Sequence, residues 1–123
     1  MYSEQILDHF RYPRNVGSIE NADSLGKAGG GPRCPEDLAY FWIRVADGRI
    51  AEVKHKTLGC PVAIAASSMT SVMAQGKTLA EAQQITPEAV AEALGGIPEQ
   101  KADSTVGPEA LHQAIAGYRA RRK

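Results

Sequence analysis

The sequence predicts an α+β fold in which a small antiparallel sheet packs against helices. An amphipathic helix opens the chain, a strand-turn-strand signal follows in residues 38–58, and the later periodic segments are helical. Strands that are grouped together, rather than alternating with helices, are typical of this class. At 123 residues the chain has the length of one domain, residues 1–123.

The first helix is predicted over residues 3–11. Ser3 is a favourable N-cap, and Ile6 and Phe10 recur at helical spacing along its apolar face. The helix is expected to end before Pro13, because the residue preceding a proline avoids the helical region.

The strands are predicted from composition and from one turn. Residues 38–45 and 50–58 are rich in β-branched and aromatic side chains, and the pair Asp47 and Gly48 between them is a strong hairpin signal. Residues 15–37 are rich in Gly, Asn, Asp and Pro and are expected to form a loop with at most one irregular strand.

Four helices are predicted after the hairpin. Pro61 suits the first position of one helix, Thr78 and Glu81 form a capping box for the next, Thr86 caps a third, and the last covers residues 108–123. The inward-facing residues are expected to be Ile64, Met69, Val72 and Met73 in the first of these helices and Leu111, Ile115 and Tyr118 in the last.

The composition is that of an ordinary soluble protein. The 14 basic side chains balance the 14 acidic ones, so the net charge favours no class of partner. The basic residues 119–123 lack interleaved aromatic residues and are expected to be a solvated helix end, so no nucleic acid is expected. Because the start does not resemble a signal peptide and no apolar run is long enough to cross a bilayer, the protein is expected to be cytoplasmic, without a membrane partner.

Cys60 is the first candidate for chemistry. It stands just before a predicted helix start, where free amide groups and the positive end of the helix dipole favour a thiolate that acts as ligand or nucleophile. A small buried residue that fills a tight turn is an equal alternative, because free cysteine is among the most buried residue types. The only other cysteine is Cys34, and in a reducing compartment the two are expected to serve as thiols, metal ligands or redox groups rather than as a disulfide.

Carboxylates and histidines offer weaker candidates. Glu36 and Asp37 follow Cys34 closely, so a carboxylate and a thiolate could converge on one cation. The three histidines are expected to be structural or surface residues, with His55 kept as an extra ligand because it precedes Cys60 by five residues. The sequence contains no phosphate loop or nucleophile elbow, and the protein is not expected to be an enzyme.

Several stretches together resemble one known family. These stretches are YSEQILDHFRYPRNVG, the Gly-rich loop that ends in Cys34, KTLGCPVAIAASSM, GKTLAEAQQIT and EALHQAIAGY. Over nearly the whole chain, and in the same order, they are similar to the IscU/NifU N-terminal family of iron-sulfur cluster assembly scaffolds. The resemblance implies an α+β fold with a three-stranded sheet, and a metal or cluster site at one end. It also implies that the protein receives sulfur from a cysteine desulfurase, builds a [2Fe-2S] cluster with iron, and passes it to apo iron-sulfur proteins.

The family site consists of three cysteines and an aspartate. The resemblance assigns two of these cysteines to Cys34 and Cys60. The family's aspartate follows its first cysteine as Cys-Gly-Asp, and Asp37 is the match here because it directly precedes the strand, although Glu36 holds the family's spacing. The implied cofactor is a [2Fe-2S] cluster or iron, with zinc as the alternative in the isolated protein.

The third cysteine of the family has no counterpart in this chain. Its Lys-x-His-Cys-Ser pattern corresponds to residues 101–105, where Asp103 and Ser104 replace the His-Cys pair, and no cysteine follows Cys60. Asp103 is therefore kept as a further metal ligand, with Ser104, His55 or a partner as alternatives. A serine hydroxyl is a hard donor that replaces a soft thiolate poorly.

These departures leave three functions open. The first is a divergent scaffold or carrier that holds iron, zinc or a labile cluster, either alone or shared between the two subunits of a homodimer. The second is a regulatory homologue that keeps the fold and its partner binding but builds no cluster. The third, a thiol redox protein that cycles Cys34 and Cys60, lacks a Cys-x-x-Cys motif. Residues 97–101 depart from the family's Leu-Pro-Pro-Val-Lys segment, so chaperone recognition is expected to be weakened. Pro61 replaces the glycine that follows the family's second cysteine, which removes an amide N–H that could have bonded sulfur.

Overall fold

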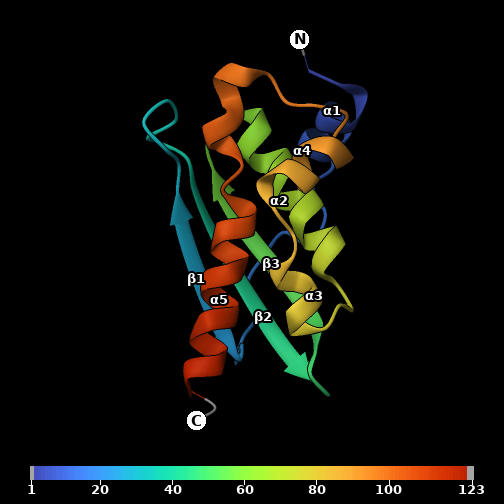
Figure 1. Ribbon diagram of the computed structural model, residues 1–123, viewed down its shortest axis with the longest axis vertical. Coiled ribbons are helices and arrows are strands. Elements are labelled where there is room, and N and C mark those ends of the chain that lie inside the picture. Colours follow the sequence, from blue (N-terminus) through green and yellow to red (C-terminus); the bar gives the residue numbers. More distant parts are fainter. Residues whose placement is uncertain (1, 122–123) are drawn as a thin grey trace.

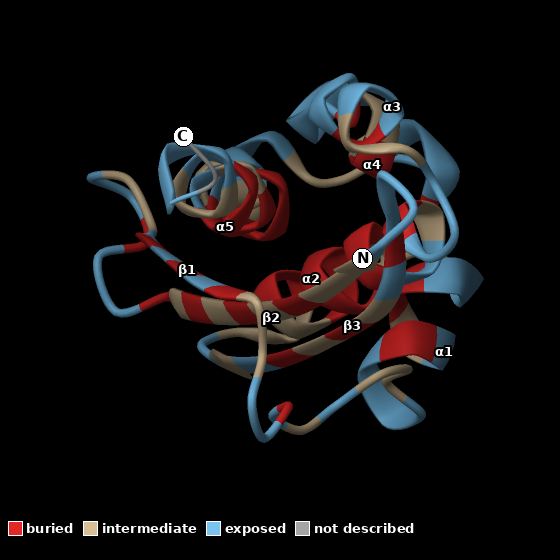
Figure 2. Cartoon of the chain, turned by 90° about the horizontal axis from the view of Figure 1, so that it is seen from below, coloured by how far each residue is buried: buried red, intermediate tan, exposed pale blue. Residues whose placement is uncertain are grey.

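The computed structural model of the protein describes residues 2–121 and confirms the predicted α+β class. Three antiparallel strands form one sheet in the order β1-β2-β3, and helices α2 and α5 cover one of its faces (Figure 1 and Figure 2). In chain order, with η1 a 3-10 helix, the elements are α1 (Glu4–Arg11), β1 (Ser24–Gly29), β2 (Leu38–Ala46), β3 (Arg49–Leu58), α2 (Pro61–Ala74), α3 (Leu79–Gln83), α4 (Pro87–Ala93), η1 (Glu99–Ser104) and α5 (Gly107–Arg121).

The hairpin between β2 and β3 forms where the turn signal predicted it. Asp47 and Gly48 have φ angles of 53° and 73°, the positive values that a tight hairpin turn requires. The strands alternate between faces, so that Phe41, Ile43 and Val53 are fully buried on the side of the helices. A one-residue slip in pairing would carry these side chains out of the core, and burial therefore fixes the register.

Strand β1 lies within the stretch that was expected to be mainly loop. It is a regular strand that pairs with β2 over its whole length, from Ser24 opposite Ile43 to Gly29 opposite Leu38. Its sequence SLGKAG contains little that favours a strand. Pairing with β2 and packing beneath α5 therefore stabilise β1 more than its own composition does.

Helix α5 approaches β1 very closely. A Cβ atom at Gly26 would overlap the carbonyl oxygen of Ala110 and the backbone of Ala114, both on α5. At the start of α5, a Cβ atom at Gly107 would lie 2.7 Å from Thr70 Oγ1 on α2. The position of α5 is thus set by contacts that leave no room for one methyl group.

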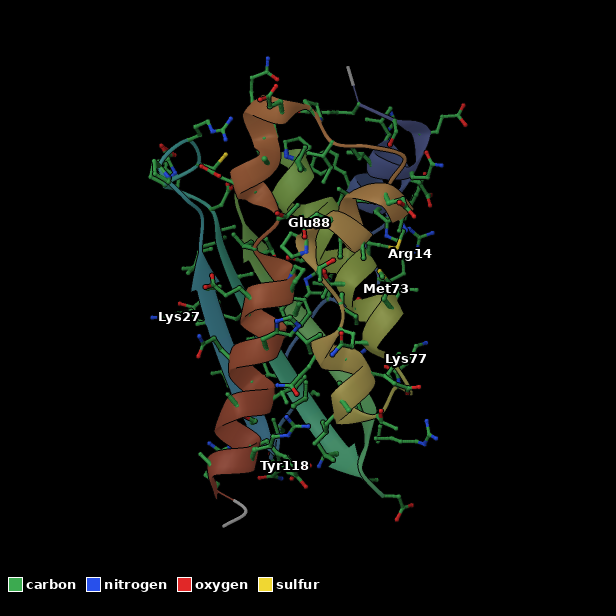
Figure 3. The ribbon with its side chains drawn as sticks, in the orientation of Figure 1. Arg14, Lys27, Met73, Lys77, Glu88 and Tyr118 are labelled. Atoms are coloured by element: carbon green, nitrogen blue, oxygen red, sulfur yellow. The ribbon has the colours of Figure 1, made fainter. Side chains whose placement is uncertain are left out.

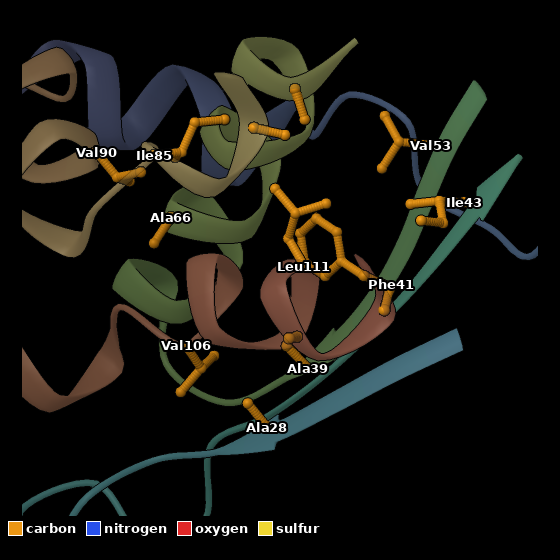
Figure 4. Close-up of a cluster of buried hydrophobic side chains, with 14 of the residues drawn as sticks. Ala28, Ala39, Phe41, Ile43, Val53, Ala66, Ile85, Val90, Val106 and Leu111 are labelled. Atoms are coloured by element: carbon orange, nitrogen blue, oxygen red, sulfur yellow. The ribbon is translucent and has the colours of Figure 1, made fainter. Parts of the chain in front are cut away.

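The core lies between the sheet and these two helices. Leu111 of α5 lies over Phe41 of β2, and both side chains are fully buried (Figure 4). Leu111 and Ile115 are buried as predicted, and Tyr118 packs partly against the same cluster. The predicted end of the last helix at residues 122 and 123 lies outside the described residues.

The predicted inward face of α2 was correct only in part. Met69 and Met73 are partly buried and pack against the core, whereas Val72 is 45% exposed and Ile64 is only partly buried. The side chains that α2 buries are mostly small, because the helix is enclosed by the sheet, α1 and α5 at short range. The buried residues are Val62, Ala63, Ala65, Ala66, Ser67, Ser68, Thr70, Ser71 and Ala74.

The apolar face of α1 was also predicted incompletely. Ser3 caps the helix as expected, its hydroxyl accepting a hydrogen bond from the Ile6 amide. Ile6 and His9 are the buried residues, whereas Phe10 is 37% exposed. His9 is buried because it has a polar partner on α2: Ser68 Oγ lies 2.8 Å from His9 Nδ1.

The remaining helix starts agree with the sequence. Thr78 and Glu81 form the predicted capping box of α3, and the Thr86 hydroxyl accepts from the Ala89 amide to cap α4. None of the helices within residues 2–121 has the length and apolar content needed to cross a membrane.

Gly26→Ala is expected to lower the free energy of unfolding by about 1–3 kcal/mol, because the added methyl group meets the backbone of α5 rather than a movable side chain. Urea denaturation measures this loss. Gly29→Ala on the same strand is the matched control, since its Cβ would meet Asp37 O at an ordinary 3.7 Å. Equal effects of the two substitutions would contradict the proposed close approach.

Candidate functional site

Four side chains from distant segments meet at one end of the sheet. Cys34 and Asp37 lie in the β1–β2 loop, Cys60 is the N-cap residue of α2, and Ser104 is the last residue of η1. Figure 1 shows the loop, the start of α2 and η1 together at this end of the molecule. The fold thus brings together two of the predicted ligands from the loop with one from the helix start.

The Ser104 hydroxyl lies at the centre of this cluster. Its oxygen is 3.0 Å from Cys34 Sγ, 3.2 Å from Cys60 Sγ and 2.6 Å from Asp37 Oδ2. A hydroxyl carries one proton and two lone pairs, so it donates to only one of these neighbours. The hydroxyl is placed to donate to Asp37 Oδ2 or to Cys34 Sγ, and the shorter contact favours the carboxylate as acceptor. Its oxygen can in turn accept from the Cys60 thiol. Ser104 is fully buried and is satisfied by this arrangement.

Asp37 connects the loop to the start of α2. Its second carboxylate oxygen, Oδ1, accepts a hydrogen bond from the Cys60 amide at 3.3 Å. Asp37 is 5% exposed, whereas the neighbouring Glu36 is exposed. Of the two acidic residues left open by the sequence, Asp37 is therefore the one inside the cluster, and Glu36 lies on its rim.

Gly59 makes the contact between Asp37 and Cys60 sterically feasible. It has a φ of +148°, a conformation that side-chain-bearing residues rarely adopt, and a Cβ atom there would overlap Asp37 Oδ1. The loop itself is closed by backbone bonds from Gly30 N to Asp37 O at 2.9 Å and from Asp37 N to Cys34 O at 3.2 Å. Gly59 therefore allows the Asp37 carboxylate to come within hydrogen-bonding distance of the Cys60 amide.

An open cleft of about 510 Å³ adjoins the cluster. Cys34 is 7% exposed and Cys60 is partly exposed, so both thiols are reached from this cleft. The cleft is lined by Arg33, Cys34, Pro35, Glu36, Asp37, Leu58, Gly59, Cys60 and Lys101.

Asp103 contacts Arg33 rather than the cluster. Its carboxylate accepts from the Arg33 amide at 3.0 Å and lies 3.7 Å from the Arg33 guanidinium. The predicted ligation by Asp103 would require this pair to open. The central position of Ser104 and the pair of Arg33 with Asp103 were missed from the sequence, although the position of Ser104 at the family's third cysteine was a usable signal.

His55 is occupied elsewhere. Its Nε2 lies 2.8 Å from the carbonyl oxygen of Arg14, its Nδ1 lies 3.3 Å from Thr57 Oγ1, and its ring stacks on Phe41 at a centroid distance of 5.4 Å. Burial lowers the pKa of His55 below its ordinary value of 6.5, and the bond to the Arg14 carbonyl opposes this shift. In this structure His55 is a core residue, which is one of the two roles, structural or surface, that the sequence favoured for the histidines.

The cluster offers two sulfurs, a carboxylate and a hydroxyl to a metal. Within residues 2–121, no group of three His, Cys, Asp or Glu side chains is positioned to hold a metal ion. Cys34, Asp37 and Cys60 nevertheless all contact the same atom, the Ser104 hydroxyl oxygen, so the three side chains surround one point. Sulfur and carboxylate donors together suit zinc or iron.

Comparison with known proteins points to one family. Residues 1–123 match the model of the NifU-like N terminal domain. The chain is 52% identical over 119 residues to an iron-sulfur cluster assembly scaffold protein IscU of Archaeoglobus fulgidus, covering 96% of this chain and 76% of that protein. It is 40% identical over 125 residues to the protein of the same name from Escherichia coli K12, covering 99% and 97%.

Solved structures share the fold. A NifU-like protein (N-terminal) from Brucella abortus superposes with a TM-score of 0.75 at 17% identity, covering 96% of this chain and 94% of that one. A putative iron-sulfur cluster assembly scaffold protein for the SUF system from Fervidobacterium islandicum gives a TM-score of 0.73 at 22% identity, covering 93% and 96%. At these identities the likeness establishes the three-stranded sheet with its helices.

Acidification is expected to destabilise the protein through His55. Because its folded pKa is lowered, the unfolded chain binds more protons below pH 6.5. The stability is thus complete above this pH and is lost as the pH falls toward the folded pKa. His9, whose pKa is lowered by burial and by the Arg14 cation, acts in the same direction.

Urea unfolding between about pH 7.5 and pH 5.5 measures this slope. His55→Gln keeps a donor that can reach the Arg14 carbonyl but does not titrate, so its slope is expected to be shallower. A slope that is unchanged in this variant would assign the pH dependence to other groups.

Proposed function

The chain belongs to the NifU-like N-terminal domain family, and on this basis we propose that it acts as an iron-sulfur cluster assembly scaffold. The observation that carries the proposal is the convergence of Cys34, Asp37 and Cys60 on one buried point beside an open cleft. Curated relatives named as such scaffolds support it. The proposed role is structural rather than enzymatic, and a cytoplasmic location is part of the proposal.

The cargo is a [2Fe-2S] cluster or iron, with zinc as the alternative in the isolated protein. Cys34 and Cys60 supply the two soft donors and Asp37 supplies the carboxylate. Ser104 adds a hydroxyl from the end of η1, and Asp103 becomes available as a ligand once its contacts with Arg33 open. The open side of the cleft is the route by which a cysteine desulfurase delivers sulfur and an apo-protein receives the cluster.

Ser104 also favours a second candidate function. Where the family pattern has a thiol, this chain has a hydroxyl that already bonds Asp37. A regulatory homologue that keeps the fold and partner binding, but builds no cluster, would carry this kind of change. Anaerobic reconstitution with iron, sulfide and a cysteine desulfurase, followed by absorption and Mössbauer spectra, separates the two. Failure to form any cluster that depends on Cys34 or Cys60 would reject the scaffold.

Cys60→Ala is expected to abolish metal retention with only a modest loss of stability, because this residue is partly exposed and its proposed role is ligation. Metal analysis of gently purified protein, together with a thermal melt, measures both effects. Val72→Ala, at an exposed position on the same helix, is the control and is expected to retain metal. Equal metal content in the Cys60 variant and the parent would remove Cys60 from the site.

Ser104→Cys is expected to lengthen the lifetime of a bound cluster, since it adds a third soft donor at the position where the Ser104 hydroxyl contacts Cys34, Asp37 and Cys60. The effect should be about tenfold or more, the scale on which changes around a metal alter its retention. The decay of cluster absorption after reconstitution measures it. Ser67→Cys, which replaces a buried serine on α2 outside the cluster, controls for the mere addition of a thiol. A cluster that decays at the parent rate would show that Ser104 does not limit cluster retention.

A further inference from the structure

The sheet has a second face that carries no helix within residues 2–121, although the segment between α1 and β1 crosses it beside Arg44 (Figure 1). Alternate residues of the three strands point away from α2 and α5, and we call the surface formed by Leu25, Lys27, Tyr40, Trp42, Lys54 and Lys56 the outer face. All six side chains are exposed or partly exposed. In Figure 2, α5 and α2 lie together on the opposite side of the strands.

The strand register arranges these side chains in two rows. Tyr40 lies between Lys27 on β1 and Lys56 on β3, and Trp42 lies between Leu25 and Lys54. Residues that are directly opposite in antiparallel strands project from the same face, so each row is a continuous strip. The two aromatic rings are 6.1 Å apart in the middle. The outer face thus has an aromatic centre with three lysines around it.

The lysines of the outer face are uncompensated. Among the residues that the structure describes, neither Lys27, Lys54 nor Lys56 takes part in an ion pair. The next row differs, because Arg44 pairs with Glu52 at 3.5 Å and also donates to the carbonyl oxygens of Glu20 and Asn21. The charge of Arg44 is therefore compensated at one end of the outer face, whereas the lysines between Arg44 and the cleft leave the rest of this surface positively charged.

The open end of this surface continues into the candidate site. Leu38 and Leu58 form the row beyond Tyr40, and Leu58 is 65% exposed and lines the cleft beside Cys60. A partner seated on the outer face would therefore extend over the thiols. This link rests on the proposed function, whereas the surface itself does not.

We propose that the outer face is the docking surface for an acidic apo iron-sulfur protein, which presents carboxylates around a small apolar patch. Trp and Tyr are typical of the centre of protein interfaces, the exposed leucines add apolar area, and charged groups at the rim steer association. A second copy of this chain does not fit, because a symmetric contact would bring the three lysines against their own kind. A nucleic acid fits less well, because the whole chain has a net charge of 0 and Leu25 and Leu58 add apolar surface.

The single tryptophan of the chain, Trp42, makes docking measurable. The metal-free full-length protein is titrated with an acidic apo [2Fe-2S] ferredoxin that lacks tryptophan, and the Trp42 emission is followed. The expected result is a saturable change, with an affinity that falls at least about tenfold between low and high salt, because screening weakens charge pairs. The double variant Lys54→Glu with Lys56→Glu is expected to lower the affinity at least about tenfold.

Two further variants test whether the effect belongs to the outer face or to the net charge of the protein. Lys27→Glu, on a different strand, is expected to weaken binding in the same direction. Lys77→Glu is the control for net charge, because Lys77 lies at the opposite edge of the molecule from Lys27 and is also exposed (Figure 3). Its binding is expected to equal that of the parent. Circular dichroism verifies that each variant is folded.

Three outcomes would overturn the proposal: equal affinity of the parent and both outer-face variants, tighter binding of a thymidine oligonucleotide than of the ferredoxin, or self-association that depends on these lysines. Because the titration needs no metal, it is independent of cluster assembly. Absent docking with normal cluster reconstitution would reject this proposal alone. Normal docking with failed reconstitution would count against the proposed scaffold function alone.

Discussion

The close contact of α5 with β1 is the constraint on which the site depends. Gly26 lets the helix backbone rest directly on the sheet, and Gly107 lets the helix start against Thr70 of α2. Ser104 ends η1 only a few residues before α5 begins. The backbone packing of α5 therefore fixes the position of the Ser104 hydroxyl, and a displacement of α5 would move Ser104 away from both thiols.

Local signals were enough to predict most of the fold. The turn at Asp47 and the caps at Ser3, Thr78 and Thr86 act within a few residues, and each is found where the sequence predicted it. Strand β1 and the buried face of α2 depend instead on distant partners. Small residues in SLGKAG and along α2 carry little periodic signal, yet close helix packing requires them. Periodicity therefore selected the larger side chains of α2, of which Met69 and Met73 pack only at the margin of the core and Val72 is exposed.

The candidate site divides in the same way. Cys34, Asp37 and Cys60 were selected by residue type and by family resemblance, and the fold brings them together. Their arrangement could not be predicted, because the contacts of Ser104 with Asp37 and Cys34 join residues 67 and 70 positions apart in the sequence. The same holds for Asp103, whose carboxylate reaches Arg33 across 70 positions. Sequence patterns identify donors, and tertiary structure decides which of them share a point.

The hydroxyl at the centre has a chemical consequence for loading. The Ser104 hydroxyl lies within hydrogen-bonding distance of Asp37 and of both sulfurs, so the buried hydroxyl and carboxylate are hydrogen-bonded without a metal. A metal held by Cys34, Asp37 and Cys60 would have to displace the thiol protons and compete with the bond between Ser104 and Asp37. A thiol at position 104 would be a weaker donor to the carboxylate and a better ligand, so it would favour the loaded site twice. Serine at position 104 therefore favours the metal-free state, and under the proposed function it would ease release of the cargo.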